Sequence, residues 1–96
     1  MALLMKTVDD ATHVEIDGEL TIYTVADLAA QLLPALGGAP RMEIDLAQVT
    51  EVDGAGLQLL MLLRREAARA GAALTVPRQS ETVSHTLELC NLVDAF

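Results

Sequence analysis

The stretch Ile44-Asp-Leu-Ala-Gln-Val-Thr-Glu-Val-Asp-Gly-Ala-Gly-Leu-Gln-Leu-Leu60 changes from a strand pattern to a helix pattern, and the other elements can be placed around it. Apolar and acidic residues alternate over residues 41–46, which is typical of a strand with one buried face. We expect a loop over residues 47–56. Six of the next seven residues are apolar and four charged residues follow, which predicts a helix over residues 57–70.

The segments after this helix predict another strand and a last helix. Residues 72–76 form a short apolar run between Gly71 and Pro77, so we expect a strand that Pro77 ends. Strand, helix and strand in this order imply a parallel, right-handed crossover. The last helix should begin near Ser80, ahead of an apolar tail over residues 92–96.

The segments before the central stretch predict a hairpin and a first helix. Residues 12–17 alternate strictly and residues 3–8 resemble a second strand, with a turn at Asp9-Asp10 and an end at Gly18. Helical spacing begins near Thr24, where Thr24 and Asp27 match a capping box. Pro34 should kink or end that helix. The whole chain is therefore predicted to be one α/β domain over residues 1–96.

Composition and charge narrow the function classes. Half of the 96 residues are hydrophobic (52%), yet the longest apolar run, residues 59–63, is too short to cross a bilayer. The net charge is −8, and residues 1–53 hold ten acidic residues against Lys6 and Arg41. Such a charge disfavours binding to nucleic acid or to anionic membranes. We expect a cytoplasmic protein without a targeting peptide, in which Cys90 is buried and reduced.

The segment over residues 50–56 is the candidate binding site, because a strand leads into a helix N-terminus there. Asp53 can cap the helix, and Gly54 and Gly56 allow a tight turn or a close approach. Two interpretations stay open at this point, a well-capped turn and a binding surface. A phosphate-binding loop is disfavoured, because the segment has no lysine and Glu51 and Asp53 would repel an anion.

Catalytic and metal-binding patterns are not recognisable. His13 and His85 lie on different predicted elements, and neither fits a triad with a nucleophile and an acid. One cysteine and two separated histidines are too few for a zinc site. The pair Asp9-Asp10 with a later aspartate is typical of a phosphate-receiver domain, but no lysine follows the third strand. We therefore expect no catalytic residue, no cofactor and no metal.

Residues 44–60 closely resemble the STAS domain family of anti-sigma-factor antagonists and sulfate-transporter tails. Gly18-Glu-Leu20 looks like the family's turn before its first helix, and residues 80–96 resemble its last helix and its closing Leu-x-x-x-Phe. The resemblance covers essentially the whole chain. It implies the STAS fold, a mixed sheet of about four strands packed by three to four helices.

The resemblance also implies partner switching, in which the loop at Asp53 and the helix after it dock on a partner. In the antagonists a serine directly follows the aspartate, and the partner phosphorylates it to end the complex. Here Gly54 and Ala55 have no hydroxyl, so docking without phosphorylation at this position is expected. The predicted docking residues are Asp53, Gly54, Ala55, Gly56 and Leu57, supported by Thr50 and by Thr21, where many relatives carry an aspartate.

The partner implied by the resemblance is a protein, either a histidine-kinase-like anti-sigma factor or a chemotaxis kinase. Two alternatives stay open: a STAS subunit of an ABC-type phospholipid transport complex, which binds the ATPase, and a STAS domain that binds a nucleotide or another small ligand. A separate argument for docking is that the helix over residues 57–70 has more apolar residues than one buried stripe uses.

Overall fold

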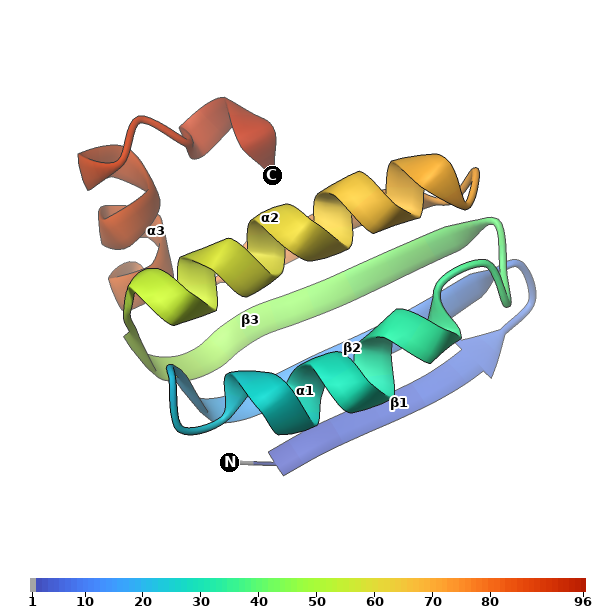
Figure 1. Cartoon of the computed structure of the whole chain (residues 1–96), viewed down its shortest axis with the longest axis horizontal. Coiled ribbons are helices and arrows are strands. Elements are labelled where there is room, and N and C mark those ends of the chain that lie inside the picture. Colours follow the sequence, from blue (N-terminus) through green and yellow to red (C-terminus); the bar gives the residue numbers. More distant parts are fainter. Residues whose placement is uncertain (1) are drawn as a thin grey trace.

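The computed structural model of the chain describes residues 2–96 and contains a four-stranded sheet with three α-helices. In Figure 1, α1 and α2 lie side by side over one face of this sheet, and α3 lies beside the end of α2. Within residues 2–96, the opposite face carries no helix. The elements in chain order are β1 (Ala2–Val8), β2 (Ala11–Leu20), α1 (Val25–Leu32), β3 (Arg41–Val52), α2 (Gly54–Arg69), β4 (Ala73–Gln79) and α3 (Glu81–Leu89).

The sheet is mixed and its strands lie in sequence order, β1-β2-β3-β4. The hairpin of β1 and β2 is antiparallel, whereas β2, β3 and β4 are parallel to one another. Parallel neighbours need a crossover, and α1 and α2 provide the two crossovers. Because β2 and β3 run in the same direction, their carboxyl ends, at Leu20 and Val52, are register partners at one edge of the sheet.

The core lies between the sheet and the helices, and it is built almost entirely from aliphatic side chains. The alternating residues of β2 and β3 point into it, and α1, α2 and α3 each contribute at least two buried residues. The largest fully buried side chains are Ile16, Leu20, Leu28, Leu32, Met42, Ile44, Leu46, Leu60 and Leu63. The predicted α/β mixed sheet of about four strands packed by three to four helices is confirmed.

Two strand ends lie further along the chain than the sequence pattern predicts. Gly18 does not end β2: it adopts φ +110° at a shift in register with β3, and the strand continues to Leu20. Residues 47–52 are not a loop but the second half of β3. Val49 is buried there, so this half still packs on the core after an irregular step in the pairing with β2.

Two predictions in the second half of the chain are corrected in the same way. The second helix begins at Gly54 and not at residue 57, because Asp53 caps it three residues earlier than the apolar pattern indicates. Pro77 does not end β4, which continues to Gln79. β4 is an edge strand and Pro77 lies where its register with β3 shifts, and both positions tolerate a residue without an N–H.

Two local predictions are also wrong. Cys90 is exposed, because it caps the C-terminus of α3 after Leu87, the last buried residue of that helix. Thr24 is the N-cap residue of α1, but its side chain makes no capping bond: its hydroxyl donates to the carbonyl of Glu19 at 2.9 Å. The turn at Asp9 and the helix end before Pro34 agree with the prediction.

Most of the apolar residues of α2 are covered by neighbouring elements. Leu59, Leu60 and Leu63 are buried, and Leu57 is half-buried against the core. Only Met61 is exposed among the large apolar side chains of this helix, at 38%. The argument for docking from excess apolar surface is therefore narrowed for this helix to Met61, because not every one of its apolar side chains is covered. No helix within residues 2–96 is long and apolar enough to span a membrane.

Candidate functional site

The candidate site lies where the carboxyl ends of β2 and β3 lead into α1 and α2. Asp53 joins the two loops. One carboxylate oxygen, Oδ1, accepts a hydrogen bond from the backbone N–H of Gly56 at 2.9 Å and caps α2. The other, Oδ2, accepts from the backbone N–H of Ile22 at 2.9 Å. A single side chain therefore caps one helix and ties down the loop before the other.

The loop before α1 has its own hydrogen bonds, which fix the backbone between Leu20 and Val25. Thr21 is buried, and its hydroxyl oxygen accepts from the N–H of Tyr23 at 3.3 Å. The hydroxyl of Thr24 accepts from the N–H of Thr21 at 3.1 Å. These bonds hold the two threonines inward and leave the two residues between them facing outward.

Ile22 and Tyr23 are those outward residues, and sequence reasoning missed them. Their exposed fractions are 62% and 89%, so two large apolar side chains face solvent next to Asp53. Tyr23 is the single tyrosine of the chain. A large aromatic residue in a polar turn between a strand and a helix was the available signal. A tyrosine held on a fixed loop is well suited to protein contacts.

The two glycines of the loop have different roles. Gly54 is exposed, and an added Cβ would find no atom within 4 Å. Gly56 is buried, and an added Cβ would overlap the carbonyl oxygen of Leu20. That carbonyl also accepts a hydrogen bond from the N–H of Asp53 at 3.3 Å. Gly56 therefore permits the close packing of α2 on β2, while Gly54 leaves open space at the start of the helix.

The other predicted site residues are distributed around Asp53. Leu57 and Ala55 are half-buried, and the N–H of Leu57 donates to the carbonyl of Asp53 at 3.0 Å. Thr50 is exposed on β3, and its neighbour Val49 points into the core, so Thr50 faces away from the side that α2 covers. The structure thus brings the loop residues and Thr21 together and leaves Thr50 apart from them.

Backbone hydrogen bonds set the electrostatics of Asp53. The N–H of Ile22, and after it that of Gly56, lower the pKa of the Asp53 carboxyl below its ordinary value. The bond from Gly56 occupies one of the N–H donors through which the start of α2 would hold a phosphate, and the carboxylate itself would repel that anion. Asp53 therefore acts as the internal anion of this site. This geometry disfavours a nucleotide pocket formed by the loop.

We expect Asp53→Ala to lower the Tm by about 5 °C, because the variant loses an N-cap and the bond to Ile22. The lowered pKa predicts that the wild-type advantage is full at neutral pH and disappears as pH falls through the folded-state pKa. Thermal melts of both proteins between pH 7 and about pH 2 measure this. A constant difference in Tm across that range would contradict the assigned role of the ionised carboxylate.

Acidic residues elsewhere do not complete a catalytic cluster around Asp53. Asp9 and Asp10 form the turn at the start of β2, at the end of the sheet opposite to Asp53. The arrangement expected for a phosphate receiver is therefore absent from residues 2–96. Within these residues, no three His, Cys, Asp or Glu side chains are placed to hold a metal ion.

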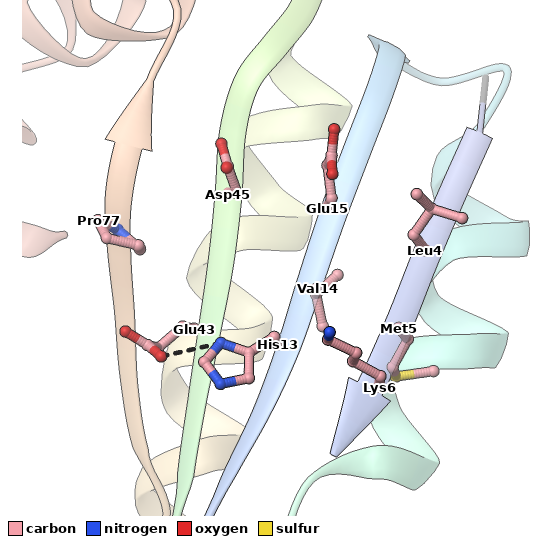
Figure 2. Close-up of a pocket in the computed structure, with 9 residues that line it drawn as sticks. All are labelled: Leu4, Met5, Lys6, His13, Val14, Glu15, Glu43, Asp45 and Pro77. Atoms are coloured by element: carbon pink, nitrogen blue, oxygen red, sulfur yellow. Dashed lines mark ion pairs between the residues drawn. The ribbon is translucent and has the colours of Figure 1, made fainter. Parts of the chain in front are cut away.

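A shallow hollow on the helix-free face of the sheet is the other polar region. Figure 2 shows His13 beside Glu43 in this hollow, with the imidazole Nδ1 and the carboxylate Oε2 at 3.0 Å. Asp45 pairs with Arg78 at 3.5 Å at its margin. Both pairs are partly exposed to solvent, so they make this face polar and contribute little to stability.

The comparisons with known proteins agree with this architecture. The family model described as "Mlab, STAS domain" matches residues 4–94. The chain belongs to the STAS domain family. Its structure is similar to an anti-sigma factor antagonist from Mycobacterium paratuberculosis, with a TM-score of 0.87, 20% identity, and coverage of 99% of this chain and 81% of that one.

Two more solved STAS structures have the same fold. A protein titled a putative anti-sigma factor antagonist from Thermotoga maritima matches with a TM-score of 0.81 and 22% identity, over 94% of this chain and 79% of that chain. The anti-sigma factor antagonist SpoIIAA in its unphosphorylated form matches with a TM-score of 0.79 and 21% identity, over 97% and 84%. The likeness extends over almost the whole STAS chain described here.

Proposed function

We propose that this STAS protein is a non-catalytic regulator that binds a signalling protein through the surface formed by Ile22, Tyr23, Asp53, Gly54 and Leu57, called here the Asp53 surface. The observation that carries the proposal is the exposure of Ile22 and Tyr23 on a loop that Asp53 holds in place. Apolar side chains on an ordered loop lose little entropy on binding, so they favour docking. The solved relatives titled anti-sigma factor antagonists support a regulatory role.

The class of partner follows from the family and from the charge of the chain. A kinase-type anti-sigma factor or a chemotaxis kinase is the leading candidate, and the ATPase of an ABC-type phospholipid transporter is the alternative. The chain has a net charge of −8, so a partner with a basic rim around an apolar pocket would be attracted over a distance. Such a pocket would accept Tyr23, with its ring buried and its hydroxyl at the rim.

Titration of purified candidates of these three classes from the same organism, by calorimetry, tests the proposal. We expect one candidate to bind and Tyr23→Ala to weaken that binding about tenfold, since aromatic anchors dominate interfaces. Met61→Ala is the matched control, because Met61 is an exposed apolar residue on the middle of α2. Equal losses for both variants, or tight binding of ATP or GTP by the chain alone, would contradict a docking role for the Asp53 surface.

The proposed docking is independent of phosphorylation at the loop. We expect a cognate kinase with ATP to leave residues 50–57 unmodified, because Gly54 and Ala55 have no hydroxyl to form a phosphate ester. The hydroxyls of Thr21 and Thr24 are engaged in hydrogen bonds and their residues are buried. Peptide mass spectrometry after incubation measures this. Phosphate on Thr50 would show a displaced acceptor and overturn the prediction.

A further inference from the structure

The outer edge of β1 is the least protected part of the sheet. β1 is hydrogen bonded to β2 alone, so the backbone groups on its other side have no strand partner within residues 2–96. Leu4, Met5 and Val8 are exposed by 64%, 41% and 44%. We propose that this edge is a homodimer interface, in which β1 pairs antiparallel with β1 of a second copy of the chain.

The two edge strands differ in how well they are protected against pairing with another strand. β4 carries Pro77 and Arg78 and pairs with β3 through a shift in register, and these features disfavour the addition of a strand. β1 has no proline, and its register with β2 runs without a shift from Ala2 to Val8. Lys6 is the single charged residue in this strand. β1 is therefore a regular, exposed and mostly apolar edge strand.

The hairpin determines which backbone groups of β1 face outward. Asp9 and Asp10 form a two-residue turn, so Val8 and Ala11 are the closing pair and exchange hydrogen bonds. Hydrogen-bonding directions alternate along a strand, so the even-numbered residues of β1 bond to β2. Leu3, Met5 and Thr7 direct their N–H and C=O groups outward. These three residues are the ones available to a second strand.

One register satisfies all three outward residues in a two-fold symmetric pair. With Met5 opposite Met5 of the second copy, Leu3 lies opposite Thr7, and each of the three pairs can exchange both of its backbone hydrogen bonds. The same register places Lys6 opposite Leu4 of the second copy. The two lysines therefore do not face each other.

The neighbouring registers are less favourable. Within residues 2–8, a shift by two residues in one direction keeps only the two pairs of Leu3 with Met5. The opposite shift places Lys6 directly opposite Lys6 of the second copy. A shift by one residue would place each residue whose N–H and C=O groups point outward opposite a residue whose groups are already bonded to β2, so the pair could not exchange hydrogen bonds. The sequence of β1 is therefore self-complementary in one alignment, which is why we assign the partner as a second copy of this chain.

Sedimentation velocity of the full chain at increasing concentration tests the proposal. The mass should approach twice the 10.2 kDa of the chain as the concentration rises to about 1 mM. A two-fold interface is closed, so association should stop at the dimer. A single 10.2 kDa species over the whole range, or growth to larger oligomers, would overturn the proposal.

Two substitutions at Leu4 separate association from folding. Within the monomer Leu4 lies opposite Glu15, as Figure 2 shows, whereas in the proposed dimer it lies opposite Lys6 of the second copy. Leu4→Lys therefore places a favourable charge next to Glu15 and a repulsive one next to Lys6, and should raise the dimer Kd at least about fivefold. Leu4→Glu places a repulsive charge next to Glu15 and a favourable one next to Lys6 of the second copy, and it should leave the dimer intact. Weaker dimers for Leu4→Glu than for Leu4→Lys would contradict the register.

Disulfide cross-linking of introduced cysteines tests the register directly. The variants are made in a Cys90→Ser background, because Cys90 is exposed and could cross-link itself. The proposed Met5 pair has Cα atoms about 5.5 Å apart, within the range of a disulfide. Met5→Cys should therefore cross-link under mild oxidation, while Lys6→Cys, two residues out of register with its copy, should not. Equal cross-linking of the two variants would show random collision and overturn the assignment.

Discussion

Replacing Gly56 with alanine is expected to lower the free energy of unfolding by about 2–3 kcal/mol, although alanine is the better helix former by about 1 kcal/mol. The added Cβ would overlap the Leu20 carbonyl oxygen and lie 2.8 Å from its carbon. That carbonyl is held by the N–H of Asp53 and belongs to β2. Backbone cannot rotate away as a side chain can, so α2 would have to shift from the sheet.

Urea denaturation of Gly56→Ala and Gly54→Ala measures this difference between two glycines of one helix. Gly54 lies two residues away with open space around its Cβ position and no positive φ, so Gly54→Ala should leave the stability unchanged or raise it by a few tenths of a kcal/mol. If Gly56→Ala were as stable as Gly54→Ala, the close contact of α2 with β2 would not constrain the helix start.

The contrast between these glycines shows which parts of the site can be predicted from sequence. The pair Gly54 and Gly56 indicated a close approach, but the pattern could not say which glycine made it. That depends on Leu20, 36 positions earlier in the chain, which comes into contact only through the parallel pairing of β2 and β3. Asp53 was recognisable as the cap of α2, whereas its second bond, to Ile22, depends on the same pairing.

Element types were predictable because hydrophobic periodicity reports which face of an element is buried. The alternation over residues 41–46 correctly indicated β3, and the apolar run after residue 57 indicated α2. The end of β3 was misplaced because Ala47 and Gln48 interrupt the alternation where the strand makes an irregular step. Glycine and proline also misled at Gly18 and Pro77, since a register shift and an edge position tolerate them within strands.

The exposed positions were the least predictable. Met61 and Leu62 have the same character in the sequence, yet Leu62 is half-buried and lines a hollow with Leu33 and Leu36, while Met61 is exposed. The same limit applies to Ile22 and Tyr23, whose exposure results from the hydrogen bonds of Thr21 and Thr24. Propensity indicates that a residue is apolar, but tertiary contacts decide whether it remains available to a partner.

Replacing Gly54 with glutamate is expected to weaken partner binding at least about thirtyfold while the fold stays intact. Gly54 is exposed on the Asp53 surface, so a side chain there would enter the proposed interface. A carboxylate covered by a partner without a matching cation would lose its hydration, and unpaired charges in interfaces cost about 2–5 kcal/mol. The resemblance to the antagonists implies that they carry a phosphate at this position, and glutamate supplies part of that charge.

The fold itself should tolerate this glutamate for reasons that the structure makes specific. Residue 54 is the first residue of α2, where a carboxylate interacts favourably with the helix dipole. The carboxylate of Asp53 next to it opposes this gain, but both groups are reached by solvent, which screens their repulsion. Circular dichroism melts should therefore place Gly54→Glu within a few degrees of wild type.

Gly54→Gln is the control that separates charge from size, since glutamine has nearly the same volume without the charge. If the unpaired charge determines the loss, Gln should weaken binding several-fold less than Glu, because a covered amide loses much less hydration free energy than a covered carboxylate. Equal losses for Gln and Glu would identify a steric fit at Gly54. Equal affinity of wild type and Gly54→Glu, with both folded, would place this end of α2 outside the interface, because no partner can cover an added carboxylate there without cost.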